Sequence, residues 1–250
     1  MARTAGELLL GRFGGPARGV DVKSSSTDMV SAADRDAEAL IQGVLREERP
    51  EDGLLAEEGG RETAESGRRW IVDPLDGTTN FLYGLPAWAV SVALEDAEGG
   101  LVGVVFDPVR EELFAALRGD GATLNGEPLR MPSHDDLATA LVATGFGYER
   151  ERRALQAQAL VRVLPRVRDV RRAGAAALDL SWLAAGRLDG YYERGLGPWD
   201  WAAARLIVSE AGGALADLEG EPHGLAAASP ALLPQLLDLL GDAEAGVFAT

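Results

Sequence analysis

The chain contains no cysteine, and this absence excludes disulfide bonds, thiolate nucleophiles and zinc–thiolate sites. Long apolar runs are also missing: nothing approaches a membrane span, and the three leucines at 8–10 are too few for a signal peptide. Acidic residues outnumber basic ones, so the net charge is −16, which argues against a general affinity for nucleic acid or anionic membranes. We therefore expect a cytoplasmic protein whose partner is a small molecule.

The stretch WIVDPLDGTTNF, residues 70–81, gathers polar side chains at the end of an apolar run. The apolar residues at its start predict the end of a buried strand, and Pro74, which has no N–H, stops the hydrogen-bond ladder. A turn at Pro74 and Leu75 can bring the Asp73 and Asp76 side chains and the Leu75 carbonyl to one point. Such a set of oxygen ligands suits a hard cation.

The residues that follow favour a phosphate. Gly77 allows close backbone approach, and Thr78 and Thr79 are predicted to form the first turn of a helix, where free N–H groups and the positive dipole end attract anions. An ordinary turn explains the same pattern about as well, with an aspartate that caps a helix and a glycine at positive φ. The stretch alone leaves both interpretations open.

Periodicity predicts two unlike parts in the chain. The first part combines helix-like segments with short apolar runs separated by glycine turns, which are typical of antiparallel strands, and in the second part strands alternate with helices. We place the boundary near 131–136, which gives an N-terminal α+β part, 1–132, and a C-terminal α/β part, 133–250. The predicted helices span 3–13, start at about 34, and span 148–164, 174–185 and 198–212. An antiparallel meander is predicted over 87–130, and strands at 53–60, 137–146 and 188–193, followed by a strand and a closing helix in the tail.

Several charged residues have simple structural explanations. Asp34 stands at the start of a helix, where an N-cap is expected, and Asp200 stands in a first helical turn, where it complements the dipole. Adjacent glutamates such as Glu57 and Glu58 are on most surfaces only solvated charges. The eight arginines within 150–172 are typical of a solvated helix face, although they also fit a polyanion partner.

Four segments in this order resemble the inositol monophosphatase family of magnesium-dependent sugar phosphatases. They are the segment with Lys23, Asp28 and Asp34, the paired glutamates of GLLAEEGG, the central WIVDPLDGTTNF, and PWDWAAARLIVSEAGG near the C-terminus. The agreement spans about residues 23–213, and chance agreement at all four places is hard to credit. The resemblance implies a layered αβαβα sandwich, in which N-terminal helices and an antiparallel sheet join a C-terminal α/β part.

The resemblance implies the ligands of two or three metal ions. Glu57, Asp73 and the Leu75 carbonyl would hold a first ion, while Asp73, Asp76 and Asp200 would hold a second. Ligation by oxygen alone, without sulfur or imidazole, selects Mg²⁺ or Mn²⁺ rather than zinc. Carboxylates brought so close together raise one another's pKa, and divalent cations relieve this repulsion.

The resemblance also implies catalytic and substrate-binding roles. Glu57 and Thr78 would help to deprotonate the attacking water, and Asp34 would orient the Thr78 hydroxyl. Asp200 and its metal would stabilise the leaving group. The predicted substrate contacts are Asp76, Gly77, Thr78, Gly174, Ala176 and Glu193.

The reaction so implied is direct hydrolysis of a small sugar or polyol monophosphate, with no phosphoenzyme intermediate. Inositol 1-phosphate ranks first, and fructose 1,6-bisphosphate, histidinol phosphate and an adenosine bisphosphate are alternatives within the same fold. The chain has Gly197 where some inositol-specific members carry a histidine, so the identity of the sugar stays open. Family members are usually homodimers, and some relatives are thought to regulate RNA or the transcription machinery, a role that the intact metal ligands argue against as the sole function.

Overall fold

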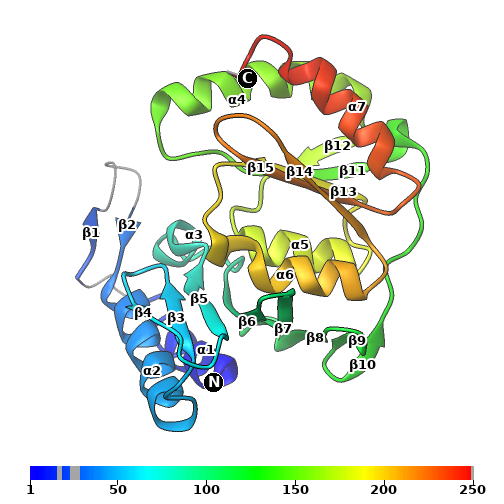
Figure 1. The fold of residues 1–250 in the computed structure, drawn as a ribbon. Helices are drawn as coiled ribbons and strands as arrows, with labels where there is room; N and C mark the ends of the chain where they lie inside the picture. The colour runs from blue at the N-terminus through cyan, green and yellow to red at the C-terminus, as the bar shows by residue number, and fades with distance from the viewer. Residues whose placement is uncertain (16–18, 23–28, 249–250) are drawn as a thin grey trace.

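The computed structural model describes residues 1–15, 19–22 and 29–248, so Lys23 and Asp28 of the resembling segment lie outside the described residues. The elements stack in five layers: helices, a large sheet, helices, a smaller sheet and helices (Figure 1). This architecture confirms the predicted layered fold that mixes α+β and α/β parts.

The larger sheet has eight strands and is antiparallel except where β3 pairs with β5. Strands β6 to β10 pair in chain order, as the predicted meander over 87–130 requires. In their order across the sheet the strands are β10 (Glu127–Leu129), β9 (Gly121–Leu124), β8 (Glu112–Leu117), β7 (Gly99–Asp107), β6 (Ala89–Asp96), β5 (Arg69–Asp76), β3 (Gly53–Ala56) and β4 (Arg61–Glu62).

The smaller sheet is mixed, because β11 is parallel to both of its neighbours and β15 is antiparallel to both of its own. Its order is β12 (Asp169–Arg171), β11 (Leu141–Thr144), β13 (Gly190–Arg194), β15 (Gly224–Ala228) and β14 (Ala214–Leu218). The sequence predicts one strand in the tail, whereas the structure has β14 as well. Its alanine- and leucine-rich sequence has no strand pattern, so pairing with β15 makes it a strand. Separately, β1 (Asp21–Val22) pairs with β2 (Met29–Val30) in antiparallel orientation.

Three helical layers cover or separate the sheets (Figure 1). One pair packs on the outer face of the larger sheet, a second pair lies between the two sheets, and a third pair covers the outer face of the smaller sheet. These pairs are α1 (Ala2–Leu10) with α2 (Ala32–Glu48), α5 (Ala176–Ala184) with α6 (Pro198–Glu210), and α4 (Arg150–Val163) with α7 (Leu233–Glu244), while the short α3 (Thr78–Leu82) follows β5.

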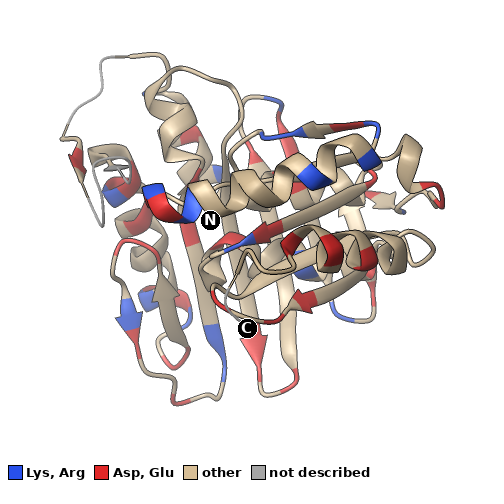
Figure 2. Cartoon of the chain, turned by 90° about the horizontal axis from the view of Figure 1, so that it is seen from above, with Lys and Arg blue, Asp and Glu red and all other residues tan. Residues whose placement is uncertain are grey.

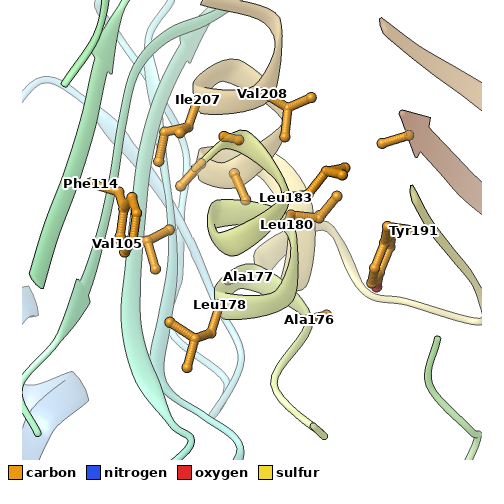
Figure 3. Packing of buried hydrophobic residues seen from close by; sticks show 14 of the residues in the cluster. Val105, Phe114, Ala176, Ala177, Leu178, Leu180, Leu183, Tyr191, Ile207 and Val208 are labelled. Atoms are coloured by element: carbon orange, nitrogen blue, oxygen red, sulfur yellow. The ribbon is translucent and has the colours of Figure 1, made fainter. Parts of the chain in front are cut away.

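The central pair of helices forms the core between the sheets. Leucines of α5 meet Val105 and Phe114 of the larger sheet, side chains of α6, and Tyr191 of the smaller sheet (Figure 3). Helix α6 lies close against β7, since a Cβ on Gly103 would come within 2.4 Å of the Ala203 carbonyl oxygen. This packing fixes the first turns of α5 and α6 relative to the end of β5.

Strand β5 differs from the sequence prediction. The prediction ends the strand before Asp73, but β5 continues to Asp76, and Asp76 still pairs with Ala89 of β6. The register shifts between Asp73 and Asp76, so Pro74 lies in an irregular stretch of the strand rather than at its end. Pro74 has no N–H to donate to β6, and the local bulge lets the pairing of the two strands resume after it. The bulge also brings the side chains of Asp73 and Asp76 to the same side.

Charged residues of both signs are interspersed along the helices and near strand ends (Figure 2). Many arginines pair with acidic neighbours, as Arg118 does with Asp96 at 2.7 Å and Arg205 with Asp217 at 2.9 Å. Within the described part of the chain, none of the helices combines the length and the apolar composition needed to cross a bilayer.

Candidate active site

The predicted site residues meet at one pocket of about 310 Å³. The pocket lies where the end of β5, the start of α3, and the first turns of α5 and α6 converge beside the end of β13. Of the predicted residues, only Asp34 does not line it; the others that do are Glu57, Asp73, Leu75, Asp76, Gly77, Thr78, Gly174, Ala176, Glu193 and Asp200.

Three carboxylates converge in this pocket. Asp73, Asp76 and Asp200 each place an oxygen within 4.8 Å of the other two. Asp73 and Asp76 are buried and Asp200 is half-buried. Glu57, from the turn after β3, lies close enough for its charge to raise the pKa of all three. The structure thus brings together the four acidic side chains that the sequence analysis assigned to metal binding.

Hydrogen bonds hold Asp73 and Asp200 in place. The Leu75 N–H donates to Asp73 Oδ1 at 3.0 Å, so Asp73 closes the irregular turn of β5. Asp200 stands in the first turn of α6, and its Oδ2 accepts the Gly197 N–H at 2.6 Å. Asp200 therefore fills the structural role expected at a helix start while its carboxylate also faces the pocket.

Asp76 is tied to a distant part of the chain. Its two oxygens accept three backbone N–H groups from the start of α5: Ala176 at 3.1 Å, Ala177 at 2.8 Å and Leu178 at 3.3 Å. The residue before α5 is Ala175, which has no side-chain oxygen to cap the helix. Asp76 supplies that cap across 101 residues of sequence, and in doing so brings Gly174 and Ala176 to the pocket.

Burial and crowding raise the pKa values of the three aspartates. Burial raises the pKa of Asp73 well above its usual value, and the charges of Glu57, Asp76 and Asp200 raise it further. Burial raises the pKa of Asp76 to about 7, although the N–H groups of α5 oppose this rise. The pKa of Asp200 is raised for the same reasons, first burial and then the charges of Glu57 and Asp76. The site therefore disfavours the charged form of its own carboxylates, and a bound cation would favour that form.

The donor atoms agree with that conclusion. The pocket offers carboxylate oxygens and the Leu75 carbonyl, and the chain has no cysteine to supply sulfur. Hard divalent cations such as Mg²⁺ and Mn²⁺ prefer this oxygen set. Several buried carboxylates at such short separations need either protons or a metal to coexist. The residues present therefore fit a divalent cation.

Thr78 joins the pocket to α2. Its Oγ1 lies 2.7 Å from Asp34 Oδ1 and 3.1 Å from the Leu75 carbonyl oxygen. The second oxygen of Asp34 accepts the Ser31 N–H at 2.9 Å and the Ser31 hydroxyl at 2.5 Å, at the start of α2. The N-cap of α2 is therefore Ser31 rather than Asp34, the residue that the sequence predicts. Asp34, at the third helical position, completes the capping box with one oxygen and holds the Thr78 hydroxyl with the other.

Glu193 lies on the side of the pocket formed by the smaller sheet. Its Oε2 accepts the Tyr191 hydroxyl at 2.8 Å. Gly145 permits this placement, because a Cβ there would come within 2.0 Å of Glu193 Oε1. Burial raises the pKa of Glu193 to about 7, while the Tyr191 hydroxyl and the Arg172 charge oppose the rise.

Several residues of the site are not predicted from the sequence. Arg152 and Arg172 belong to the arginine-rich segment 150–172, but both line the pocket rather than an open helix face. The sequence predicts Tyr191 only as part of a strand, with no role in the site. Glu38 was not singled out, although it lies four residues after Asp34, a spacing that puts both side chains on one face of α2. That spacing was the available signal for Glu38; for the two pocket arginines the sequence carries none.

The layered fold and the acidic pocket together define a class of protein: a layered α/β protein whose clustered carboxylates could hold a divalent cation. The model of the inositol monophosphatase family matches residues 1–242, and the chain belongs to this family. The resemblance seen in the sequence is therefore confirmed.

Similar proteins carry two kinds of name. The chain is 40% identical over 253 residues to "Nus factor SuhB" of Escherichia coli (strain K12), covering 97% of this chain and 95% of that protein. It is 47% identical over 202 residues to an "Inositol-1-monophosphatase" of Mycobacterium bovis, covering 77% and 70%. Among solved structures, the Thermotoga maritima IMPase superposes with a TM-score of 0.88 at 29% identity, covering 98% of this chain and 96% of that one.

These comparisons support phosphatase chemistry on a phosphate ester and leave the particular ester open. They also bear on the expectation that nucleic acid is an unlikely partner. A relative that spans nearly the whole chain carries the name "Nus factor SuhB", and this name weakens that expectation. A regulatory role accordingly remains a second candidate function.

Proposed function

We propose that the chain is a Mg²⁺-dependent phosphatase that hydrolyses a small sugar or polyol monophosphate, with inositol 1-phosphate ranked first. One observation carries the proposal: the oxygens of Asp73, Asp76 and Asp200 lie within 4.8 Å of one another beside a threonine that is held by a buried aspartate. The match of the family model supports the phosphatase class.

We assign the cation ligands as the resemblance implies. One ion would be held by Glu57, Asp73 and the Leu75 carbonyl, and another would be held by Asp73, Asp76 and Asp200. The resemblance also allows a third ion at the same site. When bound, such ions acidify water, neutralise phosphate charge and stabilise a leaving oxygen. Mn²⁺ has the same ligand preference and is expected to substitute.

The residues around the ions carry out the proton chemistry. A water oxygen attacks phosphorus, the ester P–O bond breaks, and the departing alkoxide takes up a proton from solvent. Glu57 accepts a proton from the attacking water, and the Thr78 hydroxyl orients that water because its own hydrogen is directed to Asp34. The backbone at Gly77 and Thr78 receives the phosphate oxygens at the start of α3.

The other end of the substrate would lie against the smaller sheet and α5. Glu193, held by Tyr191, accepts hydrogen bonds from substrate hydroxyls, and the turn at Gly174 and Ala176 provides the remaining contacts. Arg152 and Arg172 place positive charge in the same pocket as the carboxylates, which favours an anionic ester.

A phosphate-release assay over a small substrate panel tests this function. We expect turnover of inositol 1-phosphate with Mg²⁺ and loss of turnover in chelator, with fructose 1,6-bisphosphate, histidinol phosphate and an adenosine bisphosphate as the competing esters. A different best substrate would replace inositol 1-phosphate within the same proposal. Release of no phosphate from any ester with Mg²⁺ or Mn²⁺ would refute it.

Divalent cations should stabilise the protein more as the pH rises. Folding raises the pKa of Asp76 from 3.8 and that of Glu193 from 4.5, both to about 7. At pH values between the unfolded and the folded pKa, the folded state holds more protons than the unfolded state. The contribution of these groups to the free energy of unfolding therefore falls as the pH increases. A cation favours the charged aspartates and competes with protons, so the rise in Tm given by Mg²⁺ should be larger at about pH 8 than at about pH 5.

Differential scanning calorimetry with and without Mg²⁺ measures this difference. Asp120→Asn removes a carboxylate from an exposed turn and should leave the Mg²⁺-induced rise unchanged, whereas Asp73→Asn should abolish most of it. An equal rise at both pH values, or an unchanged rise in Asp73→Asn, would mean that the ion binds elsewhere.

A regulatory role is the second candidate, favoured by the relative named "Nus factor SuhB" and by the arginines of α4 and its flanks. Retention of the chain on RNA at physiological salt, with loss of retention on substitution of Arg150 and Arg153, would support it. Absence of retention would leave the phosphatase as the function.

We also propose that residues 1–132 and 133–250 are the two structural parts of the chain. All strands of the larger sheet fall in the first and all strands of the smaller sheet in the second. Because α6 packs on the larger sheet, the parts should unfold together rather than singly. Homodimer formation and a cytoplasmic location stay predictions.

A further inference from the structure

Helix α2 holds two parts of the site through two acidic side chains. Asp34 and Glu38 are one helical turn apart and therefore point from the same face of α2. Asp34 reaches the Thr78 hydroxyl at 2.7 Å. Glu38 is only 5% exposed and reaches a different segment, the turn of residues 57–60 that follows β3.

Both oxygens of Glu38 bind the backbone of that turn. Oε2 accepts the Glu58 N–H at 2.8 Å, and Oε1 accepts the Gly60 N–H at 3.2 Å. Oε1 also accepts the Gln42 side-chain amide at 2.8 Å. A buried carboxylate with three donors is fully engaged and costly to remove, because each donor would lose a charged acceptor.

The turn is shaped to let Glu38 approach. A Cβ on Gly60 would lie 2.2 Å from Gln42 Nε2 and 3.1 Å from Glu38 Oε1, so only glycine fits there without displacement. The other end of the turn is fixed to the larger sheet, since the Glu57 N–H donates to the Val72 carbonyl at 3.1 Å. Val72 directly precedes Asp73, so the turn is held between β5 and α2.

Glu57 is the residue of this turn that lines the pocket. Its backbone is anchored on one side by β5, and the next residues are anchored by Glu38, so the direction of its side chain depends on both anchors. Without Glu38 the N–H groups of Glu58 and Gly60 would lose this acceptor, and the turn would depend more on its own backbone bond from the Ala56 N–H to the Gly60 carbonyl at 2.8 Å, which does not fix its orientation relative to α2.

We propose that Glu38 is a positioning residue that holds Glu57 against the aspartate cluster and so sets the affinity of the site for its cation. The inference rests on the proposed function, because it takes Glu57 to be a cation ligand. Groups that orient a metal ligand typically contribute about 10- to 100-fold to metal affinity. A purely structural Glu38 would affect the folding stability and leave cation binding unchanged.

Glu38→Gln in the full chain tests the proposal. Glutamine keeps the size of the side chain but puts an NH₂ group where one backbone N–H needs an acceptor. We expect Mg²⁺ titrated by calorimetry without substrate to bind about 10- to 100-fold more weakly. We also expect faster hydrogen exchange at the Glu58 and Gly60 amides, and a kcat at saturating Mg²⁺ that changes far less than the Mg²⁺ concentration for half-maximal rate.

Glu47→Gln is the matched control, since it removes one carboxylate from an exposed position of the same helix and should bind Mg²⁺ as the wild type does. If Glu38→Gln does not fold, Glu38→Asp, which is too short to reach both amides, takes its place. Unchanged Mg²⁺ affinity and unchanged amide exchange in a folded variant overturn the inference.

The same data separate this inference from the proposed function. A wild type that binds Mg²⁺ but hydrolyses no ester refutes the phosphatase proposal, and the variant's Mg²⁺ affinity still decides the role of Glu38. A wild type that hydrolyses esters, with a variant that binds Mg²⁺ equally well, refutes only the role of Glu38. A wild type that binds no Mg²⁺ refutes both.

Discussion

Replacing Asp73 by asparagine is expected to lower kcat/KM by about 10³-fold or more, because the change removes a charge from the centre of the cation site. The Asp73 carboxylate lies within 4.8 Å of those of Asp76 and Asp200 and is the ligand assigned to both ions. Steady-state kinetics over a range of Mg²⁺ concentrations measures the loss, which higher Mg²⁺ should restore only in part.

The fold should survive this change. Asparagine retains the oxygen that accepts the Leu75 N–H, so the turn in β5 is preserved. The substitution also removes a buried carboxyl group, whose pKa is raised by burial and by its acidic neighbours. The Tm without metal should therefore stay equal or rise. Near-normal turnover by Asp73→Asn would contradict the assignment of the cation ligands.

Asp107→Asn is a matched control. Asp107, the last residue of β7, is buried as Asp73 is, and its Oδ1 accepts the Val109 N–H at 2.9 Å, two residues on, as Asp73 does with Leu75. It pairs with Arg110 at 2.8 Å and is not among the described residues that line the pocket. This variant should lose stability and keep its activity, the opposite of the result expected for Asp73→Asn.

Replacing Thr78 by valine is expected to lower kcat by about 10²- to 10³-fold, with a smaller effect on KM. A hydroxyl has one hydrogen, and the charged Asp34 oxygen at 2.7 Å is a stronger acceptor than the Leu75 carbonyl at 3.1 Å. In the proposed mechanism the lone pairs of the Thr78 hydroxyl are then available to orient the attacking water. Valine keeps the shape of the side chain and removes this acceptor.

Two further variants test the link between Thr78 and Asp34. Thr79→Val changes the neighbouring hydroxyl, which is not among the described residues that line the pocket, and should leave kcat within about twofold. Asp34→Asn should lower kcat as well, and the double variant Asp34→Asn with Thr78→Val should be little worse than Thr78→Val alone. Additive losses would show that the two residues act independently.

Much of the local structure was predictable because its causes lie within a few residues. Pro74 forces an irregularity next to Asp73, Gly77 adopts a φ of 91° before α3, and Pro198 begins α6 with Asp200 in its first turn. The antiparallel meander was predictable for the same reason, since glycine turns join strands that pair with their neighbours in sequence. These features also carried the resemblance to the family.

Other features were missed or misread because their causes are distant in sequence. The strand β5 continues past its proline since β6 pairs with it again at Asp76. In α4 the polar Gln156 is buried together with Ala159 and Val163, because the contact with α7 and the end of β13 selects the buried face. Packing at a distance in sequence also decides which arginines of segment 150–172 lie on the surface and which, Arg152 and Arg172, line the pocket.

The sequence by itself determined the chemistry available to this protein: oxygen ligands without sulfur, a turn that gathers Asp73 and Asp76, and helix starts that present Thr78 and Asp200. Only the tertiary structure decided that these groups form one site. Asp76 caps α5 across 101 residues, and Glu38 holds the turn of Glu57. The physical reason is that local pattern fixes which groups a segment carries, whereas the packing of α2, α5 and α6 on the two sheets fixes which groups meet.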